Sequence, residues 1–174
     1  MLSALFQKKR FEQAVRAYSG DLFRYLYWVC RDRAQAEDLV QETFARAWAA
    51  WERQEDANAV KAWLFTIARR EHARLFEKKA LEVDAEGDLD AIADPLPADP
   101  ALALDMARAL AALPLAYREP LLLQVLGGLT GAEIAAACGC SEEAALMRLS
   151  RARRALRNRF EDAPARAAST RSSP

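Results

Sequence analysis

Six arginines gather near the end of this chain, and their side chains suit the binding of phosphate groups. They lie within residues 148–159, with no acid among them: Arg148, Arg151, Arg153, Arg154, Arg157 and Arg159. A guanidinium forms charge-assisted, often paired hydrogen bonds to phosphate oxygens. Just before them, Gly139 separates two short helical segments, as in a helix-turn-helix. The pattern predicts a second helix that binds nucleic acid, although the formal net charge of the chain is zero.

The remaining reactive residues give little support to metal or catalytic chemistry. Cys30, Cys138, Cys140 and the single His72 are too few for a four-ligand zinc site unless a carboxylate joins them. Cys138 and Cys140 could form a redox or metal pair. Because they lie at the predicted turn, where small buried side chains are expected, we interpret them as packing residues instead. His72 is interpreted as a partly exposed surface residue. Because no nucleophile–base signature is present, we expect no enzyme activity, no metal and no cofactor.

The charges divide the chain into two parts. Residues 81–100 carry seven acids, three prolines and no base, which predicts an acidic flexible linker. It separates an N-terminal domain, 1–80, from a C-terminal domain, 101–162, and a disordered tail is expected over 163–174. No apolar run reaches the ~20 residues that span a bilayer, and the start lacks the apolar core of a signal peptide. We therefore expect a cytoplasmic protein.

Both domains are predicted to be helical, so the fold class is all-α. Apolar residues recur at spacings of three to four, and no alternating strand pattern occurs. In the N-terminal domain Gly20 is expected to break the first helical stretch, and Asp32 to cap the next helix. A last helix is expected over 59–79, with Trp63 in the core.

The C-terminal domain has clear signals for the ends of its helices. Pro120 is expected to open a helix near Arg118. Thr130 and Glu133 have the spacing of a capping box. Gly139 suits the left-handed residue of the following turn.

Three segments, in this order, make the chain resemble the extracytoplasmic-function (ECF) sigma factors of bacteria. They are AEDLVQETFARAW (36–48), AWLFTIARREHARLFEKK (62–79), and a C-terminal stretch that runs from ALAALP (109–114) through EIA (133–135) to RLSRARRAL (148–156). The resemblance covers roughly residues 11–160. It implies sigma domain two, a linker, and sigma domain four with its helix-turn-helix.

The resemblance implies that a polar face in the N-terminal domain binds core RNA polymerase. Asp38, Gln41 and Glu42 match the family's contact with the clamp helices of the largest polymerase subunit. Two carboxylates and an amide within one helical turn also make a compact acceptor patch for arginines of a partner. A second contact, with the polymerase flap, is implied as well.

The helix over 59–79 matches the element that melts and reads the minus-ten promoter sequence. Such an element needs a basic track for one DNA backbone and a surface for an unstacked base. Family members usually carry Asn where this chain has Arg70 and Asp where it has Arg74. The residues expected to bind minus-ten DNA are Asn58, Lys61, Phe65, Arg69, Arg70 and Arg74.

The last helix matches the one that reads the minus-thirty-five element as duplex DNA. Ala144 and Leu146 stand where the family often has a small polar residue and a lysine, and they can touch thymine methyls but cannot donate hydrogen bonds to bases. The residues expected to bind this element are Ser141, Glu143, Ala144, Arg148, Arg151 and Arg154.

The family also implies a partner that silences the protein, and two other functions stay open. The partner would be an anti-sigma factor, membrane-anchored or soluble, and the free chain would be a monomer. One alternative is a stand-alone helix-turn-helix regulator that binds a palindromic site as a dimer. The other is a sigma-like module that sequesters a protein partner through the apolar residues Ala144–Met147.

Overall fold

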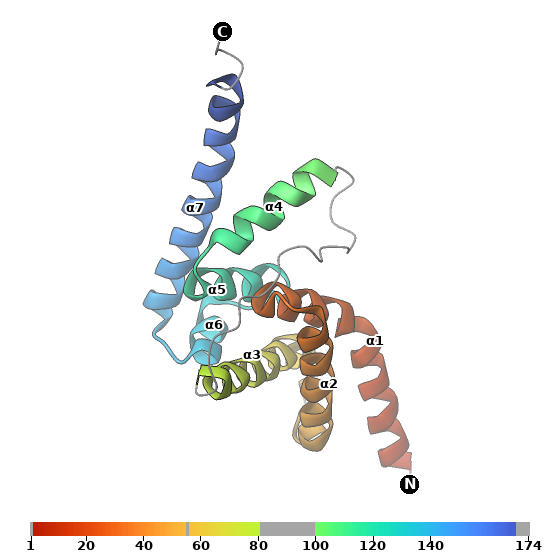
Figure 1. Ribbon diagram of the computed structural model, residues 1–174. Helices are drawn as coiled ribbons and strands as arrows, with labels where there is room; N and C mark the ends of the chain where they lie inside the picture. Colours follow the sequence, from red (N-terminus) through yellow and green to blue (C-terminus); the bar gives the residue numbers. More distant parts are fainter. Residues whose placement is uncertain (1, 55, 81–99, 170–174) are drawn as a thin grey trace.

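The computed structural model describes residues 2–54, 56–80 and 100–169, and every regular element in these ranges is a helix (Figure 1). The all-α prediction is confirmed. Apart from Pro100, the predicted linker 81–100 lies outside the described residues. The elements in chain order are α1 (Leu2–Cys30), α2 (Arg33–Ala50), the short 3-10 turns Trp51–Arg53 and Ala57–Ala59, α3 (Val60–Ala80), α4 (Pro100–Ala112), α5 (Leu115–Val125), α6 (Gly131–Cys138) and α7 (Glu142–Ser169).

Helix α1 is continuous through Gly20, so the predicted break at this residue is wrong. Leu22 and Tyr25, just after it, are fully buried, and packing on α2 and α3 supports a continuous helix past the glycine. A helical glycine costs only about 1 kcal/mol relative to alanine. The break comes eleven residues later, where Arg31 adopts a φ of 59°. Asp32 then caps α2 as predicted, because its carboxylate accepts from the Gln35 backbone N–H at 3.0 Å.

A cluster of aromatic rings packs between α1, the end of α2 and the start of α3. The Phe11 ring lies 4.9 Å from Trp48 and 5.0 Å from Trp51, centroid to centroid. Trp63, predicted to be core, is half-buried and lies 6.0 Å from Trp51. These rings fix α2 against α1 and thereby set the direction of the exposed face of α2.

The helix-turn-helix forms as its caps predict. Both hydrogen bonds of the Thr130–Glu133 capping box are present, and Gly139 is left-handed with a φ of 64°. The expected helix start near Arg118 is wrong, because α5 begins at Leu115. The backbone N–H groups of Tyr117 and Arg118 donate to the Pro114 carbonyl at 2.9 Å, so the first turn is already formed before Pro120.

Helix α7 is longer than predicted. The region expected to be a disordered tail, 163–174, is helical as far as Ser169, and 170–174 lie outside the described residues. Four alanines between 163 and 168 favour the helical state. Within the described ranges no helix combines the length and the apolar character that crossing a membrane requires.

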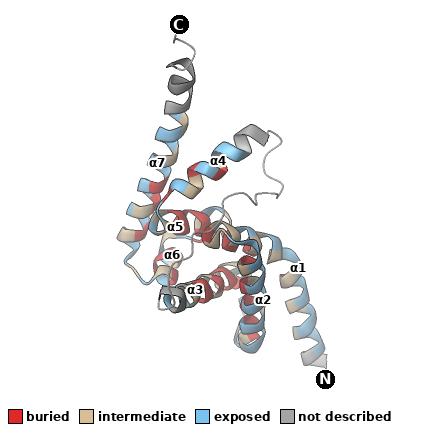
Figure 2. Cartoon of the chain, in the orientation of Figure 1, coloured by how far each residue is buried: buried red, intermediate tan, exposed pale blue. Residues whose placement is uncertain are grey.

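The two groups of helices share one hydrophobic core. Helix α1 contacts α5 and α3 contacts α6, and buried residues run without interruption across this junction (Figure 2). Phe65 of α3 and Leu123 of α5 are both fully buried there. The structure therefore shows the N-terminal and C-terminal helices packed against each other.

Candidate functional site

The acceptor patch on α2 is exposed, as expected from its sequence. Asp38, Gln41 and Glu42 all lie on the solvent face. Glu42 is already engaged, because its carboxylate lies 2.8 Å from Nε of Arg46, which also contacts Glu71 at 3.0 Å. Among the described residues Asp38 has no ion pair. Asp38 and Gln41 are thus the members of the patch best able to accept hydrogen bonds from a partner.

A hollow of about 620 Å³ lies beside this patch, between α1 and α2. Phe23 and Val40 supply apolar surface, and Gly20 exposes backbone at its edge. Sequence reasoning missed this groove, although apolar residues beside an exposed glycine could have signalled it. The lining residues are Ser19, Gly20, Phe23, Arg24, Arg33, Glu37, Val40 and Gln41.

Four of the six residues expected to bind minus-ten DNA lie at or near the surface. The backbone N–H of Asn58 donates to Asp56 at 2.8 Å, and its side chain is exposed. Lys61 forms an ion pair with Asp21 at 3.1 Å. Arg70 is exposed, and Arg74 lies 3.0 Å from the Glu71 carboxylate.

The other two, Phe65 and Arg69, are turned toward the C-terminal helices. Phe65 is fully buried, and its ring lies 5.4 Å from that of Tyr25. Two guanidinium nitrogens of Arg69 donate to the Glu119 carboxylate of α5, at 3.3 and 3.4 Å. In this arrangement DNA cannot reach Phe65, and the two N–H groups of Arg69 that bind Glu119 are not available to a phosphate.

A buried polar cluster fills the junction around this ion pair. Burial raises the pKa of Glu119, while the Arg69 guanidinium opposes that shift. Arg118 is buried as well and donates to the Leu113 carbonyl at 3.3 Å and to the Val29 carbonyl of α1 at 3.5 Å. The cluster therefore ties α5 to both α1 and α3.

His72 belongs to the same junction, so the expectation of a surface histidine is wrong. Only 2% of its surface is exposed. Burial, followed by the charges of Arg69 and Arg118, lowers the pKa of His72 to about 4. The one-turn spacing from Ala68 to His72 places it on the buried face of α3, which helical periodicity could have indicated.

The start of α7 presents an exposed, mostly apolar face. Ser141 caps the helix by accepting from the Ala144 N–H at 3.1 Å. Glu143 is exposed and Ala144 half-buried, while Leu146 and Met147 are 51% and 48% exposed. Met147 was not among the expected contact residues, yet it lies on the same open surface.

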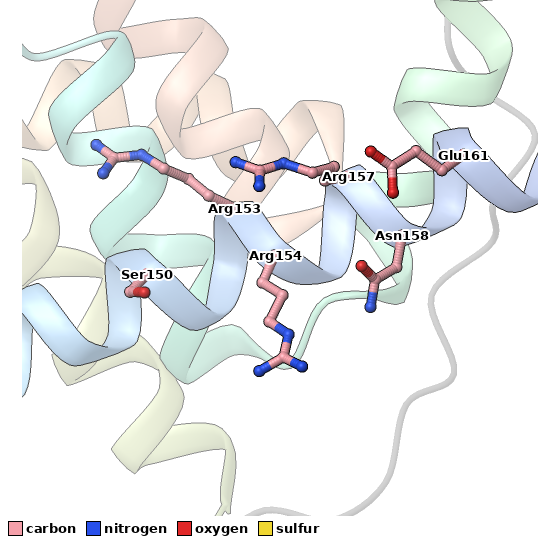
Figure 3. Close-up of a pocket in the computed structure, with 6 residues that line it drawn as sticks. All are labelled: Ser150, Arg153, Arg154, Arg157, Asn158 and Glu161. Atoms are coloured by element: carbon pink, nitrogen blue, oxygen red, sulfur yellow. The ribbon is translucent and has the colours of Figure 1, made fainter.

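Further along, α7 carries a strip of exposed arginines. Figure 3 shows Arg153 and Arg157 extending from one side of the helix and Arg154 from another. A hollow of about 560 Å³ here is lined by Ser150, Arg153, Arg154, Arg157, Asn158 and Glu161. Arg153 bonds to Gln124, and Arg151 donates to the Tyr117 hydroxyl at 3.3 Å. Within the described part of the chain, no carboxylate forms a salt bridge with these arginines.

The expected arginine at position 148 lies differently from the rest. Arg148 is half-buried, and its charge acts on the Glu119 carboxylate of α5, within the C-terminal helices. It therefore lies between the exposed face of α7 and the buried cluster. Arg151 and Arg154 are exposed.

The cysteines show no sign of a reactive pair. All three are free thiols and half-buried, and burial raises the pKa of Cys138 to about 11. A raised pKa disfavours the thiolate that redox chemistry requires. Over residues that the structure describes, no group of histidine, cysteine and acidic side chains could hold a metal ion.

Comparison with known proteins assigns both halves of the chain. Residues 14–81 match the model of sigma-70 region 2, and residues 103–156 match that of sigma-70 region 4. The chain is 36% identical over 129 residues to the ECF RNA polymerase sigma factor SigF of Caulobacter vibrioides, covering 73% of this chain and 72% of SigF. It is 37% identical over 150 residues to SigL of Mycobacterium tuberculosis, covering 80% and 82%. It spans only 35% of the length of another relative, the probable sigma factor RfaY of Xanthomonas campestris, with 35% identity.

The fold is also similar to those of solved structures. The sigma factor RpoE, in complex with the anti-sigma factor NepR from Bartonella quintana, matches with a TM-score of 0.76 and 31% identity, over 88% of this chain and 98% of that one. CnrH, in complex with the cytosolic domain of CnrY, matches with a TM-score of 0.61 and 25% identity, over 87% of each chain.

Proposed function

Because this chain belongs to the ECF RNA polymerase sigma factors, we propose that it binds core RNA polymerase, directs the enzyme to specific promoters and helps to melt them. The observation that carries the proposal is the arginine strip of α7, which follows directly on the open face of a helix-turn-helix. Neighbouring guanidiniums on one helix repel one another, and DNA phosphates would relieve that repulsion.

Each surface has a role in this proposal. Asp38, Gln41 and Glu42 contact the clamp helices of the polymerase, and the C-terminal helices contact the flap. Helix α3 and the loop before it engage minus-ten DNA through Asn58, Lys61, Phe65, Arg69, Arg70 and Arg74. Helix α7 engages the minus-thirty-five duplex through Ser141, Glu143, Ala144, Arg148, Arg151 and Arg154.

The protein would act as a cytoplasmic initiation factor without a reaction of its own, and the free chain would be a monomer. We also propose that an anti-sigma factor controls it. Support comes from RpoE, which was solved in complex with the anti-sigma factor NepR and resembles this chain over 88% of its length.

The exposed Leu146 and Met147 favour one other function, a module that sequesters a protein partner through an apolar face. The two functions are separated by retention of genomic DNA fragments on immobilised core polymerase, with and without the chain. We expect a discrete set of fragments to be retained only when the chain is present. Binding to polymerase without selective retention of DNA would favour the sequestering module instead.

A further inference from the structure

One carboxylate at the junction of the two helix groups lies close to arginines from both expected DNA-binding surfaces. Glu119 of α5 has only 9% of its side chain exposed. It accepts two hydrogen bonds from Arg69 of α3, at 3.3 and 3.4 Å. The charge of Arg148 on α7 acts on the same carboxylate. Glu119 thus holds Arg69 directly and attracts Arg148.

The same junction covers the aromatic residue expected to contact DNA. Phe65 is fully buried, and its ring packs closely against the backbone of Gly127. A Cβ added at Gly127 would lie 2.9 Å from Cδ1 of Phe65. Arg118, next to Glu119, donates to the Val29 carbonyl of α1 at 3.5 Å. The contact is therefore a continuous surface, with the ion pair at its polar centre.

A carboxylate and a DNA phosphate compete for the same donors of an arginine. Both accept charge-assisted, paired hydrogen bonds from the guanidinium fork. Arg69 cannot give both of its engaged N–H groups to Glu119 and to a phosphate at once. The packed arrangement also matches, over 88% of this chain, that of RpoE in a complex with an anti-sigma factor.

We propose that Glu119 is an autoinhibitory latch, which occupies Arg69 in place of DNA and holds the C-terminal helices over the minus-ten surface. The proposal rests on the proposed function for the identity of the DNA surface. Opening the junction releases Arg69 and Phe65 of α3 together. The free chain is closed by its own residues, and full binding of DNA by α3, with Phe65 and Arg69 included, requires the helix groups to separate.

The first test measures the distance between the helix groups. Dyes are attached through noncanonical amino acids at Ala49 of α2 and Ala155 of α7, both exposed, and energy transfer is measured in the full chain. We expect Glu119→Gln to increase the separated population about tenfold, because it removes one charge of a buried pair. Arg69→Gln removes the other charge of the same pair and should increase the separated population to a similar extent. Asp105→Asn, on exposed α4, is the matched control and should change nothing.

The second test measures binding of a short fluorescent single-stranded DNA of mixed sequence, without polymerase. Glu119→Gln should bind it about tenfold more tightly than the unaltered chain, and the double variant Glu119→Gln with Arg69→Gln should lose that gain. Asp105→Asn, which changes the net charge equally, should leave the affinity unchanged. Circular dichroism checks that every variant keeps its helices.

The outcomes separate the latch from the proposed function. Unchanged energy transfer in both Glu119→Gln and Arg69→Gln overturns the latch, whatever the chain does with polymerase. An equal gain in DNA affinity from Asp105→Asn also overturns it, since general charge would then explain the effect. Separation with released DNA binding supports the latch even if no transcription is obtained, in which case only the proposed function fails.

Discussion

The ring of Phe65 in α3 meets the backbone of Gly127, just after α5, so closely that no side chain fits between them. A Cβ at Gly127 would lie 2.9 Å from Cδ1 of Phe65 and 2.6 Å from the carbonyl oxygen of Leu123. The missing side chain thus lets the C-terminal helices reach α3. This contact joins the two sigma regions into one core.

Gly127→Ala should therefore destabilise the packed structure. The new methyl group meets backbone, which cannot move aside as a flexible side chain can, and overpacking of this kind costs about 1–3 kcal/mol. Gly20→Ala is the matched control, because its Cβ would meet only Nη2 of Arg24 at 3.8 Å. We expect the control to raise the free energy of unfolding by about 0.5–1 kcal/mol. Urea denaturation measures both, and a stabilising Gly127→Ala would contradict the contact.

His72 should make stability depend on pH. The pKa of His72 is lowered from 6.5 to about 4, chiefly by burial, so the unfolded chain binds its proton more readily than the folded one. Stability from this residue is fully present above pH 6.5 and is lost as the pH falls toward 4. At about 1.4 kcal/mol for each pKa unit, the loss reaches roughly 3 kcal/mol. Glu119 acts oppositely, because its raised pKa favours the folded state as that carboxyl is protonated.

The chain has one histidine, so the imidazole NMR signal can be followed directly. We expect it to titrate near pH 4. His72→Leu, compared with the unaltered chain in urea denaturation from pH 7 to pH 4, removes this contribution while leaving that of Glu119 in place. An imidazole pKa near its ordinary value, or the same pH dependence in both chains, would show that His72 is accessible to water.

Asp38→Ala combined with Gln41→Ala should weaken binding to core polymerase without unfolding the chain. Both side chains are exposed on α2, and loss of hydrogen bonds to charged partners predicts about tenfold weaker binding or more. Glu12→Ala with Gln13→Ala removes the same chemical groups from the exposed face of α1 and is the control. Fluorescence anisotropy with labelled chain gives the affinities. Equal affinity of both double variants would remove the patch from the polymerase interface.

Arg154→Ala and Arg148→Ala should affect DNA binding by the holoenzyme differently. Arg154 lies in the α7 hollow with no acidic partner, so its loss should weaken binding equally on all sequences and lower the salt slope by about one. Arg148→Ala should cost ~1–3 kcal/mol on the preferred sequence if it reads a base. Arg108→Ala, on exposed α4, is the control. Sequence-independent loss from Arg148→Ala would make it a phosphate contact.

Local signals in the sequence predicted much of the fold. The Asp32 cap, the Thr130–Glu133 capping box and the Gly139 turn form as expected, because each depends on neighbouring residues alone. The errors at Gly20 and Pro120 arose where packing of the flanking residues overrides a local preference.

The packing of the two halves was beyond the reach of the sequence. Glu119 and Arg69 are fifty residues apart, and nothing in helical periodicity pairs them. The close contact of Phe65 with Gly127 belongs to the same long-range packing. The exposure of Asp38, Gln41 and Glu42 on α2 and of the arginines on α7 could be predicted, because amphipathic spacing alone shows which side of a helix faces solvent.

Run-off transcription is the direct test of whether this chain directs core RNA polymerase to specific promoters. Fragmented genomic DNA is transcribed by purified core RNA polymerase with and without the chain, and the transcript ends are mapped. We expect discrete start sites that require the chain, preceded by shared minus-ten and minus-thirty-five sequences. Identical transcripts in the two reactions, from a chain that keeps its helices, would contradict this expectation.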